Sequence, residues 1–409
     1  MRGLRERGSL DVLSLEVFST LQLCAINEPL FPNLKSLRLR RVTEALIPLI
    51  PMFLSPGITT ISITSIESGT PAAVVASMIT TLPTLCPNLR EINFGGLPRD
   101  PVITAAVSGM LLSNNRNTLR YFNVDSPLTG EARDVIYRHP ELGGLWVVIE
   151  GPTSLPTVAL PNLVELDVEY DHDSGWLEGF RGATLGKLTS VTFRAGFESV
   201  DFLEAFESVA LTTSATTTLS KFRFYTSYPW RPNYRSLFSF TQMAKLLIEC
   251  PCERICSSSV DDDIISTLAR TMPKLETLQL GDPPCREIPT GVTAEGLAVL
   301  ARHCPDLSTL RIHFQVASFG ASPVIDWMAP NAGLTALQRD CALTELEVGL
   351  IPVPEESVTV VALTLARIFP RISYVESVDG NWLDVMSVIR CPPRQAVDYT
   401  SKDHPPLCT

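Results

Sequence analysis

A short pattern recurs down this chain: an apolar residue or cysteine, then proline, any residue, and leucine or isoleucine. Strict copies lie at Phe31–Leu34, Cys86–Leu89, Leu160–Leu163, Met272–Leu275, Cys304–Leu307 and Phe369–Ile372. The final residue of each copy opens a run of the type Leu-x-x-Leu-x-Leu. Recurrence at a spacing of tens of residues is the signature of a repeat protein. This pattern therefore constrains the fold more than any other feature of the sequence.

Each element of the pattern has a physical reason. Proline cannot continue a helix, and it pushes the residue before it toward extended backbone, so the pattern ends a preceding helix. The run that follows alternates apolar and polar residues, as a strand with one buried face does. We therefore expect a repeating unit of strand, loop, helix and stop.

The first apolar residue of each run, called the anchor below, sets the register. Neighbouring anchors lie 21 to 36 residues apart, except for a gap of 56 residues between Leu219 and Leu275, where we expect a degenerate copy near Ile255. The anchors are Leu10, Leu34, Ile58, Leu89, Leu119, Leu142, Leu163, Leu188, Leu219, Leu275, Leu307, Leu343 and Ile372.

Segments with helical periodicity separate the anchors. In the clearest, Leu297, Leu300 and Ala301 share one face, and Thr293 is the expected N-cap. The other predicted helices cover 71–85, 101–112, 131–138, 200–210, 237–248, 261–272, 356–368 and 382–389. Single strands alternating with helices predict an α/β solenoid of about 13 or 14 units, with a parallel sheet on a concave face and helices on a convex face.

The residues at 293–312, TAEGLAVLARHCPDLSTLRI, carry a family resemblance. The chain resembles leucine-rich-repeat proteins over about residues 10–390, and this stretch resembles their cysteine-containing subtype. That subtype is familiar from F-box proteins, the substrate receptors of Skp–cullin–F-box ubiquitin ligases. The proline-marked, variable-length form is similar to fungal F-box proteins with leucine-rich repeats. Family repeats carry an Asn or Cys beyond the last Leu, where this chain has Val42, Leu97 or Pro283.

The resemblance also sets the expected domain organisation. An F-box is a helical module that precedes the repeats, and the nine residues before Leu10 are too few for one. We expect a short lead without an F-box at 1–9, a leucine-rich-repeat solenoid at 10–390 and a loose tail at 391–409. A ligase adaptor would then bind only through an F-box upstream of these residues.

Composition argues against several classes of partner. The net charge is −11 at pH 7, whereas phosphate contacts need clustered Lys and Arg, so we expect no nucleic-acid partner. The basic group Arg38, Arg40 and Arg41 is read as a solvated face, with a phosphate site as the alternative. No apolar run approaches the roughly 18 residues of a membrane span, and no signal peptide follows Met1. We expect no membrane partner and a cytoplasmic or nuclear location.

Metal and catalytic motifs are weak. Cys250, Cys252 and Cys256 form the densest cysteine cluster but lack the second pair that a zinc site needs, and Cys86 and Cys304 read as small buried groups. The acidic run Asp167, Glu169, Asp171, Asp173 and Glu178 matches calcium-loop spacing, but His172 stands where the loop needs Gly. No hydrolase, phosphate-loop or metalloprotease motif is present. We expect no catalytic residue, metal or cofactor.

A partner is expected on the concave face, where strand residues two apart point away from the core. The central repeats place aromatic, acidic and Arg side chains there, the types enriched at binding hot spots. The predicted partner-binding residues are Tyr121, Asn123, Asp125, Trp146, Glu165, Asp167, Thr192, Arg194, Arg223 and Tyr225. Lys221 precedes Arg223 on the same face.

Two of these features have a structural alternative. A one-residue shift of register would bury Trp146 instead of presenting it to solvent. The loop 225–234, with Trp230, is a second candidate surface, or it packs as an ordinary loop.

We therefore expect a non-catalytic protein-interaction scaffold, first as the substrate-recognition region of an F-box-type ubiquitin-ligase receptor. A free-standing interaction or inhibitor-like protein is the alternative. A third class, an enzyme or a GTPase-activating protein, would have only Arg194 or Arg223 as central candidates. In both of the first two hypotheses the partner is a protein that binds on the concave face.

Overall fold

The structure is a computed structural model. It describes residues 20, 29–113, 118–150, 158–170, 177, 180, 183–196, 202–212, 214–226, 233–249, 260–281, 291–321, 341–349, 351–377 and 380–390. The chain divides into two compact units, Met1–Cys256 (unit 1) and Ser257–Thr409 (unit 2). No boundary at this position is predicted from the sequence, in which the repeats run through residues 10–390.

Unit 1 contains a sheet of parallel strands that pair strictly in sequence order. The strands are β1 (Ser36–Val42), β2 (Thr60–Ile66), β3 (Glu91–Phe94), β4 (Tyr121–Pro127), β5 (Gly144–Ile149), β6 (Glu165–Tyr170), β7 (Ser190–Ala195), β8 (Lys221–Thr226) and β9 (Lys245–Glu249). Each strand continues the register of its neighbour, so equivalent repeat positions lie side by side across the sheet.

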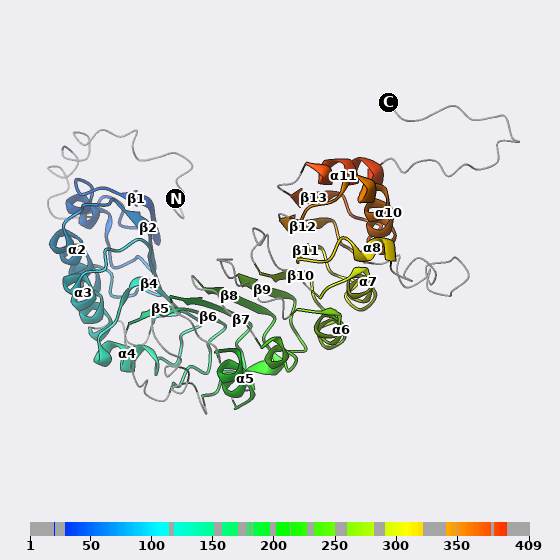
Figure 1. Cartoon of the computed structure of the whole chain (residues 1–409). Helices are drawn as coiled ribbons and strands as arrows, with labels where there is room; N and C mark the ends of the chain where they lie inside the picture. Colours follow the sequence, from blue (N-terminus) through cyan, green and yellow to red (C-terminus); the bar gives the residue numbers. More distant parts are fainter. Residues whose placement is uncertain are drawn as a thin grey trace, which may run out of the picture. The chain divides into compact units, whose positions relative to one another are not determined.

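The segments between these strands are helices of very different length. They are η2 (Ile47–Phe53), α2 (Ala72–Leu85), α3 (Pro101–Leu112), α4 (Gly130–Ile136), α5 (Phe202–Thr212), η4 (Ala215–Thr217) and η5 (Tyr234–Leu237), where η marks a 3-10 helix. The helices cover one side of the sheet (Figure 1), which leaves the other side open.

Unit 2 repeats the same plan. Its parallel strands β10 (Thr277–Leu280), β11 (Thr309–Arg311), β12 (Glu345–Gly349) and β13 (Tyr374–Ser377) also pair in sequence order. Its helices are α6 (Asp262–Thr271), α7 (Ala294–His303), α8 (Ser318–Ala321), η7 (Glu355–Ser357), α10 (Val358–Ile368) and α11 (Asn381–Arg390). The described residues of both units therefore form a repeating α/β architecture with parallel strands. None of the described helices has the length and apolar character needed to cross a membrane.

The predicted register is confirmed by burial. Every anchor that the structure describes is buried, and for all of them except Ile372 the residues three and five positions later are buried too, as in Leu89, Ile92 and Phe94. These side chains fill the space between sheet and helices. The buried anchors are Leu34, Ile58, Leu89, Leu119, Leu142, Leu163, Leu188, Leu219, Leu275, Leu307, Leu343 and Ile372.

One predicted helix is wrong. We expected a helix over 237–248, but the structure has only η5 there and then strand β9. The anchor of this repeat is Met243, which is fully buried and followed by buried Leu246 and Ile248. The degenerate repeat therefore begins at Met243 and not near Ile255, which lies outside the described residues.

Helix length follows the spacing of the anchors. Ile58 and Leu89 are 31 residues apart, and α2 between them has 14 residues. Leu219 and Met243 are 24 residues apart, and η5 has 4 residues. A strand and its two connections take most of a short repeat, so too few residues are left for three turns of α-helix, about 11 residues.

An aromatic cluster fills the core beneath β7 and β8. The Phe193 ring lies 4.8 Å from Phe202, 5.2 Å from Phe206 and 6.0 Å from Phe222 between centroids, all in edge-on contact. Such pairs stabilise a core beyond their buried area. This cluster supports the central strands of the open side.

In unit 2, neighbouring repeats are joined by a helix cap. Thr293 caps α7 as predicted, because its hydroxyl accepts a hydrogen bond from the Glu295 N–H at 3.1 Å. The Asp262 carboxylate of the previous repeat accepts from the Thr293 N–H at 2.8 Å and from its hydroxyl at 2.6 Å. A negative charge at a helix N-terminus is favourable.

Cys86 and Cys304 are fully buried, as expected. Burial raises the pKa of the Cys304 thiol to about 12 and that of Cys86 to about 11. Both thiols therefore stay protonated near neutral pH and pack as small apolar groups.

Candidate functional site

The open side of the unit 1 sheet consists of the residues two, four and six positions after each anchor. On β4, for example, Tyr121, Asn123 and Asp125 are half-buried, while the residues between them are buried. On β6 the same alternation presents Glu165, Asp167 and Glu169. We call this surface, over β4 to β8, the open face.

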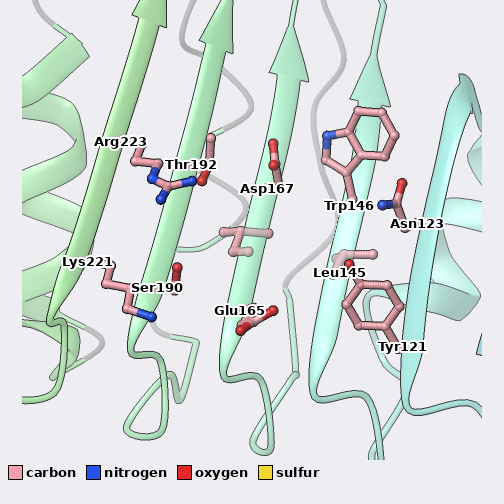
Figure 2. Close-up of a pocket in the computed structure, with 11 residues that line it drawn as sticks. Tyr121, Asn123, Leu145, Trp146, Glu165, Asp167, Ser190, Thr192, Lys221 and Arg223 are labelled. Carbon is pink, nitrogen blue, oxygen red and sulfur yellow. The ribbon is translucent and has the colours of Figure 1, made fainter. Parts of the chain in front are cut away.

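A depression with a volume of about 270 Å³ lies on the open face. Its residues come from strands β4 to β8, with Tyr121 and Trp146 at one end and Lys221 and Arg223 at the other (Figure 2). The residues that line it are Tyr121, Asn123, Leu145, Trp146, Glu165, Leu166, Asp167, Ser190, Thr192, Lys221 and Arg223.

The structure brings together seven of the ten predicted residues in this depression: Tyr121, Asn123, Trp146, Glu165, Asp167, Thr192 and Arg223. Asp125, Arg194 and Tyr225 lie outside its lining. Thr192 is only 8% exposed, so it contributes to the floor more than to the accessible surface. Ser190 was not predicted, although it lies two residues before Thr192 on the same strand and therefore faces the same side.

Trp146 lies on the open face, because it pairs in register with Asn123 and Asp167, both of which face the same way. It is half-buried rather than fully exposed. Its indole N–H is buried and has no hydrogen-bond acceptor. A buried donor without a partner is costly, so a ligand acceptor at this position would gain a hydrogen bond.

Arg194 organises the centre of the open face. Its Nη1 atom donates to Asp167 Oδ1 at 2.6 Å. Its guanidinium lies 5.6 Å from the centroid of the Trp146 ring and 5.8 Å from that of Tyr225, within the range of cation–π attraction. Arg194 and Tyr225 therefore support the depression from its edge.

Burial raises the pKa of Asp167 to about 6, although the Arg194 guanidinium opposes this by its charge and its hydrogen bond. The Trp146 indole N–H also lowers the pKa of Asp167, because it lies near the carboxylate, although the two groups do not meet the geometry of a hydrogen bond. The Glu169 carboxylate raises it slightly. Asp167 is thus ionised at neutral pH and gains a proton in mildly acidic solution.

Tyr121 forms one wall of the depression. Burial raises the pKa of its phenol; the hydrogen bond with Asn123 opposes this, while Glu165, Asp167 and Glu91 raise it further. The three carboxylates therefore give this end of the depression a negative potential. The ring lies against Gly144, where a Cβ atom would overlap it, so glycine at this position allows the ring to approach the sheet.

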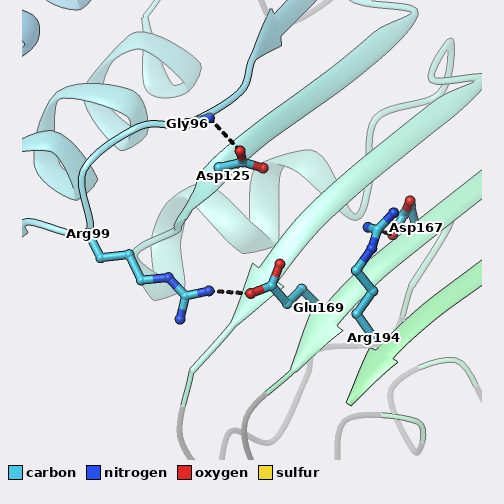
Figure 3. Close-up of polar contacts among 6 residues, drawn as sticks. All are labelled: Gly96, Arg99, Asp125, Asp167, Glu169 and Arg194. Carbon is cyan, nitrogen blue, oxygen red and sulfur yellow. Dashed lines mark hydrogen bonds and ion pairs between the residues drawn. The ribbon is translucent and has the colours of Figure 1, made fainter. Parts of the chain in front are cut away.

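A polar network borders the depression near the end of the strands (Figure 3). The Gly96 N–H donates to Asp125 Oδ2 at 2.6 Å, and Arg99 forms an ion pair with Glu169. Burial raises the pKa of Asp125, and its hydrogen bond with Gly96 opposes the rise. Gly96 has a φ of +66°, which favours glycine. The segment that carries Gly96 and Arg99 is thereby held against β4 and β6.

Several sequence predictions fall on residues outside the described ranges. These are the lead at 1–9, Cys250, Cys252, Cys256, Asp171, Asp173, Glu178, Trp230, Pro283 and the tail at 391–409. The ends of the candidate loop 225–234 are described: Tyr225 is half-buried in β8, and Tyr234 is buried in η5. Within the described ranges, no group of three His, Cys, Asp or Glu side chains is arranged to hold a metal ion.

Comparison with known proteins adds no family to this geometry. No protein-family model matches the chain, and no curated protein matches it.

Proposed function

We propose that this chain is a non-catalytic protein-binding repeat protein whose open face over β4 to β8 holds a protein partner. One observation carries the proposal: half-buried aromatic rings and charged side chains lie together around one depression. Aromatic and Arg side chains dominate binding energy at protein interfaces. An open depression on a sheet also suits a protein segment better than an enclosed small-molecule pocket does.

The more specific proposal is a substrate-recognition region of an F-box-type ubiquitin-ligase receptor, built as a leucine-rich-repeat horseshoe with the open face as its concave side. It rests on the resemblance of residues 293–312 to the cysteine-containing repeat subtype. In this reading, the partner is a target for ubiquitination in the cytoplasm or nucleus. The alternative is a free-standing interaction or inhibitor-like protein without a link to ubiquitination.

The test is quantitative affinity capture with the full chain and three variants. Trp146→Ala removes the largest ring of the depression. Tyr374→Ala is the matched control, because Tyr374 is an aromatic residue on the first position of β13 in unit 2 and is 52% exposed. A second site variant, Arg223→Ala, changes an exposed side chain, and thermal unfolding confirms that all three variants fold.

We expect a defined set of proteins that the wild type and Tyr374→Ala retain equally and that both site variants lose by about tenfold or more. Such a loss corresponds to about 1.4 kcal/mol, an ordinary hot-spot effect. Equal capture by all four proteins would show that the open face is not the binding surface. A ligase adaptor in the retained set would favour the F-box reading, and retained partners without any ligase component would favour the free-standing scaffold.

A further inference from the structure

Three charged side chains in the depression have no partner among the residues that the structure describes. Glu165 on β6 and Lys221 and Arg223 on β8 form no ion pair and no side-chain hydrogen bond with any part of the chain that the structure describes. Asp167, two residues after Glu165 on the same strand, is paired with Arg194. The lack of partners is therefore a property of these three positions and not of the face as a whole.

Strand β7 keeps the opposite charges apart. Glu165 pairs in register with Ser190, and Ser190 pairs with Lys221. Neighbouring strands are about 4.8 Å apart, so the backbones of β6 and β8 are separated by roughly 9.5 Å. On β7 between them, the depression is lined by the short side chains of Ser190 and Thr192 (Figure 2). The depression thus has an acidic side and a basic side with a floor of hydroxyl groups.

The acidic side has further features that suit a cation. Asn123 Oδ1 is a buried acceptor without a donor. Tyr121 and Trp146 present aromatic rings beside Glu165 and Asp167, and the negative potential of the nearby carboxylates acts on Tyr121. An aromatic ring, a free carboxylate and a free amide oxygen together match a guanidinium or ammonium group with several N–H donors.

We propose that the depression receives a segment of the protein partner that carries one basic and one acidic side chain about 10 Å apart. The basic group lies over Glu165 on β6, and the acidic group lies over Lys221 and Arg223 on β8. This inference rests on the proposed function and adds the chemistry of the partner. A polyproline II segment places residues three apart on the same side, about 9.3 Å apart along its axis. The preferred segment is therefore of the type Arg-x-x-Glu, in either chain direction.

The probes are capped hexapeptides displayed at high density on a sensor surface, with the full chain in solution. Ac-Gly-Arg-Pro-Pro-Glu-Gly-NH2 and its reversed form Ac-Gly-Glu-Pro-Pro-Arg-Gly-NH2 fix the spacing in polyproline II geometry. Ac-Gly-Pro-Arg-Glu-Pro-Gly-NH2 carries the same charges without the spacing. Replacing either charged residue of the first peptide with Gln removes one charge at a time.

We expect at least one of the spaced peptides to bind about tenfold more tightly than the close-spaced peptide or either Gln peptide. Glu165→Lys should abolish this preference, and so should Lys221→Glu combined with Arg223→Glu. The matched control is Glu376→Lys, a charge reversal at an exposed outward position of β13, which should bind as the wild type does. Circular dichroism establishes that the variants are folded.

Charge exchange gives a readout that a structural defect cannot produce. Glu165→Lys should gain affinity for Ac-Gly-Glu-Pro-Pro-Glu-Gly-NH2, and the double variant should gain affinity for Ac-Gly-Arg-Pro-Pro-Arg-Gly-NH2. Equal binding of all peptides to the wild type, or no detectable binding, would overturn the inference. So would binding that depends on Lys221 and Arg223 but not on Glu165, which would indicate an anion site. The capture experiment with Trp146→Ala is independent of these peptides, so the broader proposal can stand when this one fails.

Discussion

The open sides of the two units differ in how their charges are compensated. In unit 2, Arg311 and Glu347 lie on neighbouring strands and form an ion pair at 3.1 Å, with side chains only 20% and 28% exposed. In unit 1, Glu165 lies two strands from Lys221, and neither charge is paired with a residue that the structure describes. The scaffold is the same, with parallel strands in sequence order. The difference teaches that an outward position on a strand is not enough to define a binding surface. Charged side chains without a partner are the feature that indicates a binding surface.

The two units also differ in their connecting segments. In unit 2 each described strand is followed or preceded by an α-helix of ten or more residues, such as α7 and α10. Around the depression in unit 1 the connections include the short α4 and the 3-10 helix η5. Among the strands that carry the depression, the 11-residue α5 lies between β7 and β8, and its Phe202 and Phe206 belong to the aromatic cluster around Phe193.

The largest expected effect comes from removing the centre of that cluster. Phe193 is fully buried and contacts the rings of Tyr170, Phe202, Phe206 and Phe222. Phe193→Ala should destabilise unit 1 by about 3–5 kcal/mol, since it removes a large core side chain and leaves a cavity. Hydrogen exchange should show lost protection in β6 to β8.

The comparison between units predicts where that loss stops. Because repeats stabilise mainly their nearest neighbours, the amides of α7 and α10 in unit 2 should keep their protection in Phe193→Ala. Simultaneous loss of protection in both units would show that the two units unfold as one and would break the comparison.

A smaller effect on stability is expected from replacing a tryptophan, and its size should differ between Trp382 and Trp146. Trp382 in unit 2 is 2% exposed and donates its indole N–H to the Ile351 carbonyl at 2.8 Å, whereas the Trp146 N–H has no acceptor. Trp382→Phe should cost about 2 kcal/mol because it leaves the carbonyl without its donor. Trp146→Phe should change stability by less than about 0.5 kcal/mol. Urea unfolding of the two variants checks the difference, and equal losses would contradict it.

The smallest effect is a pH dependence on the open face. An unperturbed Asp has a pKa of about 3.9, and burial raises that of Asp167 to about 6 in the folded protein. The folded state therefore holds this proton more tightly than the unfolded chain does. The associated stabilisation is present below about pH 4 and is lost as the pH rises through about 6.

Asp167→Asn stays uncharged at every pH and supplies the reference. Its stability relative to the wild type should increase by about 1 kcal/mol between about pH 5 and about pH 7. Urea midpoints of unit 1 at the two pH values measure this change. A relative stability that does not vary with pH would show that the pKa of Asp167 is not raised.

Much of the fold could be predicted because one buried pattern controls it. Each anchor and the apolar residues three and five positions later must face the helices, and this fixes which side every other strand residue takes. The predicted positions of Trp146 and Glu165 followed from that constraint alone. The segment 237–248 failed because Leu237, Phe240 and Leu247 also fit a helical period, and its anchor is Met243 without a preceding proline.

Other features of the site lie beyond sequence patterns. Arg99 and Glu169 are 70 residues apart in sequence, and nothing in either segment predicts that they pair. The ion pair between Arg194 and Asp167 depends on side-chain conformation, which the strand period does not specify. The unpaired state of Glu165 is likewise visible only once its neighbours are placed.

The register of the strands has a consequence for how such a surface can change. Every outward side chain has two coordinates, the repeat it belongs to and its position along the strand. Each anchor fixes the strand register of its own repeat, so an insertion in one connection does not change which residues face outward in later repeats. A single substitution can therefore change one side chain of the open face, while the core that supports the face stays the same.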